Sequence, residues 1–181
     1  MDPTQSLSKF LAARIREIPD WPKKGILFYD ITTLLKDPAA FAQAVDALSR
    51  RYLGREIDAV VGIESRGFIF GSALAYRLGT GFVPVRKPKK LPAEVIRETY
   101  SLEYGQDTIE MHLDAVQKGQ KILLADDLLA TGGTALAACK LIERAGAEVL
   151  ECCFAIELTF LKGREKLSRY PVFSLVQYDV G

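Results

Sequence analysis

The chain has 181 residues, of which 49% are hydrophobic and 26% charged, and its formal net charge is +1. This length and composition predict one domain with its own hydrophobic core, and they exclude disordered and membrane-spanning proteins. The neutral balance gives no overall attraction to nucleic acid or anionic membranes, and the N-terminal segment lacks the features of a signal peptide, so we expect a cytoplasmic protein.

Two helices are predicted in the N-terminal part of the chain. Residues at three-and-four spacing indicate a first amphipathic helix that ends before Pro19; they are Leu7, Phe10, Leu11, Arg14, Ile15 and Ile18. A turn-rich loop follows. Asp37 and Pro38 then suit the N-cap and first turn of a second helix, whose buried stripe is Phe41, Val45, Leu48 and Tyr52.

Two strand-helix-strand units follow in the chain. Short apolar runs predict strands, and longer periodic runs that end at Gly79 and Gly146 predict helices. The expected strands are 58–63, 82–85, 122–125, 149–156 and 172–176, and the expected helices are 68–78 and about 134–145. This alternation predicts an α/β fold with a central parallel sheet flanked by helices, which binds its ligands at the carboxyl ends of the strands.

Residues 86–105, between the two units, are polar and interrupted by proline, which favours a mobile flap over a core segment. The single histidine, His112, follows in an alternating run that predicts a half-exposed strand, so an exposed histidine is favoured over a catalytic base. The cysteines lack metal-ligand spacing and lie in apolar patterns. We expect buried thiols rather than ligands or disulfides at Cys139, Cys152 and Cys153.

Residues 122–134 pass from a buried strand through an acidic pair and a glycine loop into a helix. The helix start offers free N–H groups to a phosphate, Gly132 and Gly133 allow its close approach, and the loop also contains Ala130, Thr131 and Thr134. Asp126 and Asp127 suit the two hydroxyls of a ribose, since carboxylates accept hydrogen bonds. An ordinary turn with Asp127 as a helix cap is the alternative. The ATPase loop is excluded because it requires a lysine here.

The segment DDLLATGGT resembles the phosphoribosyl pyrophosphate signature of type I phosphoribosyltransferases, and its particular residues are similar to those of the adenine-specific branch. Four further segments share the resemblance: IPDWPKKGILFYDITTLLKDP, GIESRGFIFG, YSLEYG and ELTFLKGREKL. They cover nearly the whole chain. The resemblance implies one phosphoribosyltransferase domain over 1–181, with a small N-terminal hood at roughly 1–35 and a flap at roughly 87–108.

The reaction implied by the resemblance joins adenine to phosphoribosyl pyrophosphate and yields AMP and pyrophosphate, as a pentosyltransferase of purine salvage. Magnesium is expected as a cofactor bound mainly through the substrate, with no metal ligands of its own in the protein. The resemblance also implies a homodimer. Neither nucleic acid nor a membrane is an expected partner.

The resemblance also implies roles for individual residues. Ser65 and Arg66 belong to the pyrophosphate loop, with a cis peptide expected at Glu64-Ser65, and Arg66 should lie at the same sheet edge as Asp126. Arg86 and Lys87 are expected to bind the anionic substrate, Lys90 with less support and Lys89 not at all, although a solvated charge run is the alternative.

The hood and the flap supply the remaining expected site residues. Phe28, between Leu27 and Tyr29, is expected to stack on the purine while backbone groups read its edge, and a core aromatic is the alternative. Glu103 is the expected catalytic residue and would assist proton movement on the purine, and Tyr104 beside it is an expected substrate-binding residue. The usual alternative for Glu103 is an exposed loop glutamate.

Two rival functions remain open at this point. A non-catalytic regulator could use the same fold to sense phosphoribosyl pyrophosphate and bind nucleic acid, but the neutral charge speaks against it. A transferase for hypoxanthine, guanine or xanthine would read a keto purine edge, whereas the hood and YSLEYG segments match the adenine branch.

Overall fold

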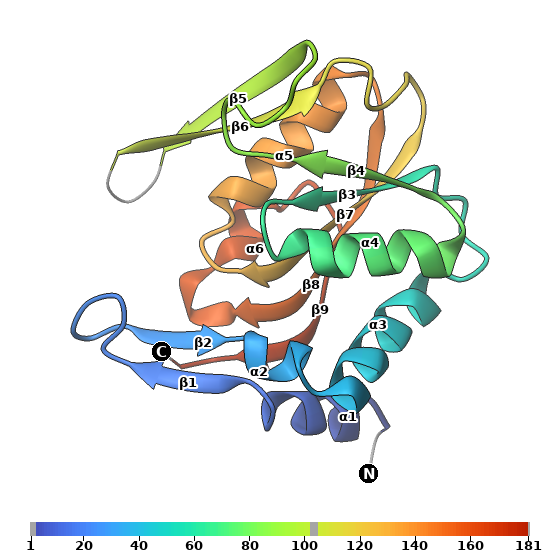
Figure 1. The fold of residues 1–181 in the computed structure, drawn as a ribbon. Helices are drawn as coiled ribbons and strands as arrows, with labels where there is room; N and C mark the ends of the chain where they lie inside the picture. Colours follow the sequence, from blue (N-terminus) through green and yellow to red (C-terminus); the bar gives the residue numbers. More distant parts are fainter. Residues whose placement is uncertain (1–2, 102–104, 181) are drawn as a thin grey trace.

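The computed structural model describes residues 3–101 and 105–180, and within them the centre of the fold is a five-stranded parallel sheet (Figure 1). The strand order is β4-β3-β7-β8-β9. The strands are β3 (Ala59–Ile63), β4 (Gly81–Val85), β7 (Lys121–Leu129), β8 (Glu148–Leu158) and β9 (Val172–Tyr178). The predicted fold class, an α/β protein with a central parallel sheet flanked by helices, is confirmed.

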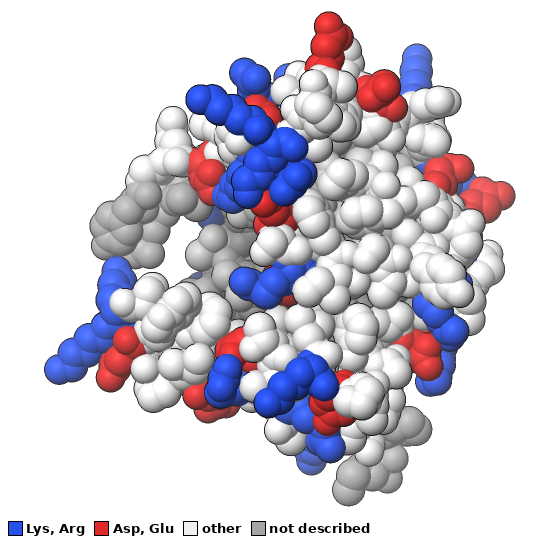
Figure 2. All heavy atoms as spheres, viewed as in Figure 1, with Lys and Arg blue, Asp and Glu red and all other residues white. Residues whose placement is uncertain are grey.

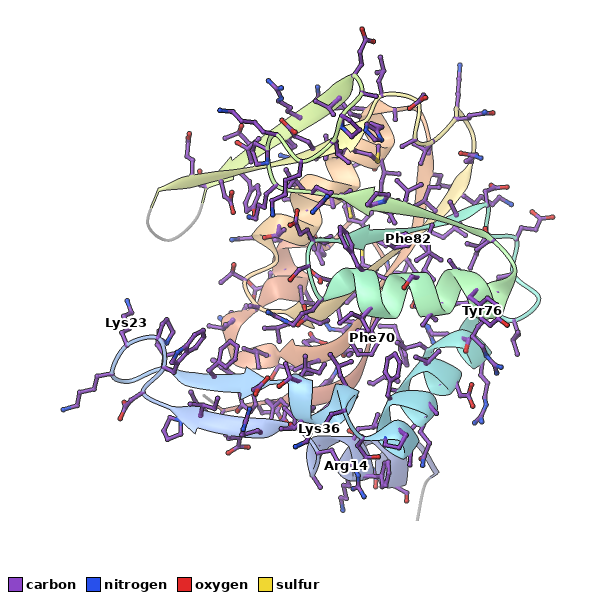
Figure 3. All side chains as sticks on the ribbon, viewed as in Figure 1. Arg14, Lys23, Lys36, Phe70, Tyr76 and Phe82 are labelled. Carbon is purple, nitrogen blue, oxygen red and sulfur yellow. The ribbon has the colours of Figure 1, made fainter. Side chains whose placement is uncertain are left out.

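Helices cover both faces of this sheet. They are α1 (Pro3–Ala12), α3 (Pro38–Tyr52) and α4 (Gly67–Leu78) on one face and α5 (Gly133–Arg144) on the other (Figure 1). Successive strand residues point to opposite faces, so Leu123 packs beneath α3 and α4 while Leu124 packs beneath α5. Figure 3 shows Phe70 of α4, which is fully buried, pointing toward α3. The strands are therefore apolar on both sides, as their sequences predicted.

The predicted helix ends are confirmed at α3 and α4. The Asp37 carboxylate accepts hydrogen bonds from the backbone N–H groups of Ala39 and Ala40, both at 3.0 Å, and Pro38 occupies the first turn. Gly79 ends α4 in the left-handed conformation, with φ +68°. These local signals depend on few tertiary contacts, which explains why the sequence reveals them.

The N-terminal prediction of one helix up to Pro19 was wrong. Helix α1 ends at Ala12, and β1 (Arg16–Pro19) then pairs antiparallel with β2 (Leu27–Asp30), followed by the short helix α2 (Thr32–Leu35). The hairpin contains residues that the sequence assigned to a loop. Its cross-strand hydrogen bonds outweigh the helical periodicity of residues 14–18, because periodicity does not reveal a distant pairing partner. We call β1 and β2 the N-terminal hairpin.

A second antiparallel pair, which we call the flap hairpin, consists of β5 (Val95–Ser101) and β6 (Gln106–His112). It lies beside α5, and Ile109 and Met111 enter the core there. His112 is partly exposed, as predicted, but the expected alternation was wrong. Glu110 is also buried, and a hydrogen bond from Arg97 to its carboxylate at 2.6 Å offsets the cost of burying this charge.

The C-terminal part adds the 3₁₀ turn η1 (Thr159–Leu161) and the short helix α6 (Gly163–Lys166) before β9. The three cysteines are buried and free, as predicted. Across residues 3–101 and 105–180, no helix combines the length and apolarity needed to cross a membrane.

Candidate active site

The glycine loop after β7 forms a small pocket of about 90 Å³ at the carboxyl end of the sheet, next to the start of α5. Its lining includes Asp126, Ala130, Thr131, Gly133 and Thr134. The first residues of α5 have no side-chain cap, so their N–H groups are available to an anion at this pocket. The structure therefore places the predicted loop residues together around a space suited to a phosphate.

Gly132 gives this loop its shape. It has φ +77°, and a Cβ atom at this position would lie 2.6 Å from the carbonyl oxygen of Gly163, at the start of α6. Both the left-handed conformation and the close backbone contact require glycine. The neighbour, Gly163, lies in a segment that the resemblance included but to which the sequence assigned no role.

The sequence predicted that Asp126 and Asp127 follow the strand, but both residues lie within it. Strand β7 continues to Leu129 because it still pairs with β8 there, whereas its pairing with β3 ends at Ala125. Burial, together with the adjacent charge of Asp127, raises the pKa of Asp126 well above its ordinary value. The two carboxyls therefore lie on the part of β7 that extends beyond its pairing with β3.

Arg66 lies in the turn after the neighbouring strand β3, at the start of α4, and faces the acidic pair from the same edge of the sheet, as predicted. Its Nε donates to Asp127 Oδ2 at 2.5 Å, and its side chain is 43% exposed while that of Asp127 is 9% exposed. Gly67 lets α4 begin against this pair, since a Cβ there would lie 2.7 Å from Asp126 Oδ1. The Glu64-Ser65 peptide bond is cis, as expected, and Ser65 is exposed.

The basic residues after β4 lie around acidic partners that the sequence did not assign to the site. The Glu64 carboxylate accepts hydrogen bonds from Arg86 at 3.3 Å, from the Lys87 N–H at 2.9 Å and from the Lys90 ammonium. Burial opposes this effect, but these bonds lower the pKa of Glu64 to about 2. The Lys89 side chain has no assigned role, while its N–H donates to Glu110 at 3.0 Å.

Figure 2 shows basic side chains gathered at the upper edge of a hollow in this face. At the carboxyl end of β4, Arg86 and Lys90 form ion pairs with the same carboxylate, that of Glu64. The ammonium of Lys87 forms an ion pair with Asp107 of β6. Cations and carboxylates therefore alternate along this edge, which leaves the cations able to exchange partners with an incoming polyanion.

Phe28 lies on β2 of the N-terminal hairpin, where its cross-strand partner is Ile18 of β1. Phe28 and Leu27 are partly buried, and the Phe28 ring meets that of Trp21 edge to face, with 4.3 Å between ring centroids. Tyr29 turns away into the core, where it stacks on Tyr178, and its hydroxyl donates to the carbonyl oxygen of Val180 at 3.0 Å. The side chain of Tyr29 is thus a core group, and only its backbone remains for a ligand.

The flap hairpin contributes two residues that the sequence did not single out. The Tyr100 hydroxyl donates to Asp107 at 3.2 Å and accepts from the Thr134 hydroxyl at 3.0 Å. Tyr100 lies in the YSLEYG segment, whereas nothing in the sequence marked Asp107. Glu103 and Tyr104, the other expected flap residues, lie outside the described residues.

Among the described residues, no group of three or more His, Cys, Asp or Glu side chains converges as a metal cage would require. The hard oxygen donors closest to the expected substrate site are Asp126 and Asp127, and Asp127 is engaged with Arg66. This donor set fits a cation that arrives on phosphate oxygens better than one held by the protein alone.

Comparisons with known proteins agree with this geometry. The phosphoribosyl transferase domain family matches residues 30–178. An adenine phosphoribosyltransferase from Acidobacterium capsulatum is 59% identical over 180 residues, 99% of each chain. The structure of an adenine phosphoribosyltransferase from Thermoanaerobacter pseudethanolicus is similar at a TM-score of 0.91 and 53% identity, covering 94% of this chain and 99% of that one. The Saccharomyces cerevisiae enzyme, solved with adenine and an iminoaltritol bisphosphate, is similar at 0.89 and 44% identity, covering 94% and 99%.

Proposed function

Because the chain belongs to the adenine phosphoribosyltransferase family, we propose that it joins adenine to phosphoribosyl pyrophosphate and releases AMP and pyrophosphate in purine salvage. One observation carries the proposal. A phosphate-sized pocket at the start of α5, two adjacent carboxyls and an arginine meet at one edge of the sheet. These groups match in order the phosphate, the ribose and the pyrophosphate of one substrate.

The substrate is proposed to lie along this edge with its 5-phosphate in the loop pocket. The N–H groups from Ala130 to Thr134 would bind the phosphate, and Asp126 and Asp127 would accept hydrogen bonds from the ribose hydroxyls. Ser65 and Arg66 would bind the pyrophosphate, with further charge from Arg86 and Lys87. Arg66 then exchanges its present partner, Asp127, for phosphate oxygens.

Adenine is proposed to enter the hollow from the side of the N-terminal hairpin. Phe28 would stack on the purine, while backbone groups of Leu27 and Tyr29 read its amino edge. A site built around the amino group leaves polar groups unpaired when a keto purine binds. We therefore expect adenine to be preferred over hypoxanthine and guanine.

The proposed reaction breaks the bond between ribose carbon one and pyrophosphate, and purine nitrogen nine attacks the resulting positive centre. The acidic pair stabilises that charge, and the basic residues hold the departing pyrophosphate. Glu103 would move a proton on the purine. The flap with Tyr104 would exclude water, which would otherwise attack ribose carbon one in place of the purine and hydrolyse phosphoribosyl pyrophosphate.

Magnesium is proposed to accompany the substrate and to be bound mainly through its phosphate oxygens, since the described residues hold no metal cage. When bound, it neutralises part of the pyrophosphate charge. The chain supplies the oxygens of Asp126 and Asp127 near this position, and their main proposed partner remains the ribose.

A homodimer is proposed to form through the exposed face of α4. Tyr76 is 86% exposed and Ile69 is 39% exposed on this helix, and Figure 3 shows Tyr76 projecting from its surface. Figure 2 shows a broad area with few charges over the same region, as expected of a self-associating face. Light scattering should give twice the chain mass for the parent and a monomer for Tyr76→Glu.

We also propose a cytoplasmic location, because free thiols suit a reducing compartment.

The assay that tests the function offers adenine, hypoxanthine and guanine to the enzyme with phosphoribosyl pyrophosphate and magnesium. Adenine should be converted to AMP, with far poorer turnover of the keto purines. Comparable rates with all three bases would refute the adenine assignment.

The ribose role is tested by Asp126→Asn combined with Asp127→Asn. The double variant should keep its fold by circular dichroism and lose turnover, since both carboxyls lie at the edge of the sheet. Asp58→Asn, a change at the opposite end of β3, serves as the matched control. Near-normal turnover in the double variant would contradict the ribose assignment.

A further inference from the structure

A chain of hydrogen bonds crosses the flap hairpin and joins two parts of the active site. The Lys87 ammonium donates to the Asp107 carboxylate, which also accepts from the Tyr100 hydroxyl at 3.2 Å. Tyr100 in turn accepts from the Thr134 hydroxyl at 3.0 Å. Tyr100 and Asp107 are direct cross-strand partners in the hairpin. The two outer members come from the segment after β4 and from the first turn of α5.

The direction of these hydrogen bonds follows from Asp107. An ionised carboxylate can only accept, so the single hydroxyl hydrogen of Tyr100 points to Asp107. The Tyr100 oxygen must then accept from Thr134, which also has only one hydrogen to donate. Thr134 consequently presents lone pairs rather than a donor to the phosphate pocket that it lines.

Both ends of the chain are groups that the proposed function assigns to phosphates. A phosphate needs the Thr134 hydrogen, and a pyrophosphate needs the Lys87 charge. Each group can serve the substrate fully only by leaving its partner in the flap hairpin. The inner end of the hairpin would lose these contacts, while Glu98 would still hold β5 to Arg144 and Lys140 of α5, at 3.1 and 3.3 Å.

We propose that Tyr100 and Asp107 are positioning residues that hold Thr134 and Lys87 in the ligand-free enzyme and compete for them with the two phosphate groups of the substrate. This inference rests on the proposed function. The four residues form a latch, and substrate binding releases the inner end of the flap hairpin from it.

The latch predicts that its removal tightens substrate binding. Tyr100→Phe frees the Thr134 hydroxyl, and a net hydrogen bond corresponds to about a two- to tenfold change in affinity. Asp107→Asn removes the charge that competes for Lys87 and should tighten binding by about three- to tenfold. Equilibrium binding of phosphoribosyl pyrophosphate with magnesium measures both changes. A merely structural role would weaken binding instead.

Matched variants separate the latch from general effects on the hairpin. The Thr99 and Thr108 hydroxyls pair across the same two strands at 2.9 Å and are not members of the hydrogen-bond chain from Lys87 to Thr134, so Thr99→Val should leave the affinity unchanged. In a Lys87→Met background, Asp107→Asn should no longer tighten binding, because the ammonium for which Asp107 and the substrate compete is absent. Hydrogen exchange should also be faster in the ligand-free hairpin of Tyr100→Phe than in the parent.

The outcomes distinguish this inference from the function on which it rests. If the parent enzyme forms AMP but Tyr100→Phe and Asp107→Asn bind the substrate no more tightly than the parent, the latch is wrong and the function stands. If the parent neither binds phosphoribosyl pyrophosphate nor forms AMP, the proposed function fails, and the latch fails with it.

Discussion

Replacement of Gly132 by alanine tests the geometry of the phosphate loop. This residue has φ +77°, and an added Cβ would lie 2.6 Å from the carbonyl oxygen of Gly163. Two costs therefore combine at one position: the left-handed conformation of a residue with a side chain and a collision with backbone that cannot rotate away.

The structure allows the two costs to be separated. The left-handed conformation costs about 1–2 kcal/mol for alanine, and overpacking typically costs about 1–3 kcal/mol more. Gly79 has a similar φ of +68° but nothing within 4 Å of an added Cβ, so Gly79→Ala carries only the first cost. The stability difference between Gly132→Ala and Gly79→Ala should thus be about 2 kcal/mol, which for a chain of this size is about 4–8 °C in Tm.

Thermal unfolding of both variants beside the parent gives the comparison, and steady-state kinetics adds a functional measure. Gly132→Ala should lower kcat/KM for phosphoribosyl pyrophosphate by about tenfold or more, because small displacements of binding groups are costly. Gly79→Ala, at the far end of α4, should keep the parent value. If Gly132→Ala is as stable as Gly79→Ala and equally active, the contact with Gly163 does not shape the loop.

Three further predictions concern separate parts of the molecule. Iodoacetamide should label none of the cysteines in the native enzyme and all of them after unfolding, because all three are buried away from the reagent. Burial also raises the pKa of Cys153, and the hydrogen bond with Cys139 together with burial raises the pKa of Cys152. Rapid labelling of the native enzyme would contradict this prediction. Hydrogen bonds from Thr32 and Arg16 lower the pKa of Asp30 from 3.8 to about 2 in the folded protein. The ionised Asp30 carboxylate therefore stabilises the fold fully above the pKa of the unfolded chain, and this stabilisation is lost as the pH falls through the pKa of the folded protein. The Tm gap between the parent and Asp30→Asn should therefore narrow from about pH 4 towards pH 2, and a constant gap would count against it. Glu103→Gln should lower kcat by about 10²–10⁴-fold without weakening equilibrium binding of AMP, and a kcat within about threefold of the parent would leave the proton-transfer role unassigned.

The sequence by itself determined the features that depend on neighbouring residues. Buried strands appear as continuous apolar runs, and Asp37 and Gly79 mark helix ends through local hydrogen bonding and backbone conformation. The glycine loop before α5 indicates the position of the loop pocket to which we assign a phosphate. The parallel sheet follows because its strands alternate with helices. The pairing of Arg66 with the acidic pair could be anticipated, since carboxyl ends of parallel strands meet at one edge.

Only the tertiary structure decided which distant groups become partners. The strand at residues 16–19 forms because residues 27–30 pair with it, and the first helix is therefore shorter than the sequence predicted. In the same way, Glu64 meets the basic residues after β4, and Asp107 meets Lys87, through contacts 20 or more positions apart in the chain. Hydrogen bonds and ion pairs between such groups depend on distances of a few ångströms, and these distances exist only once the sheet and its hairpins have assembled.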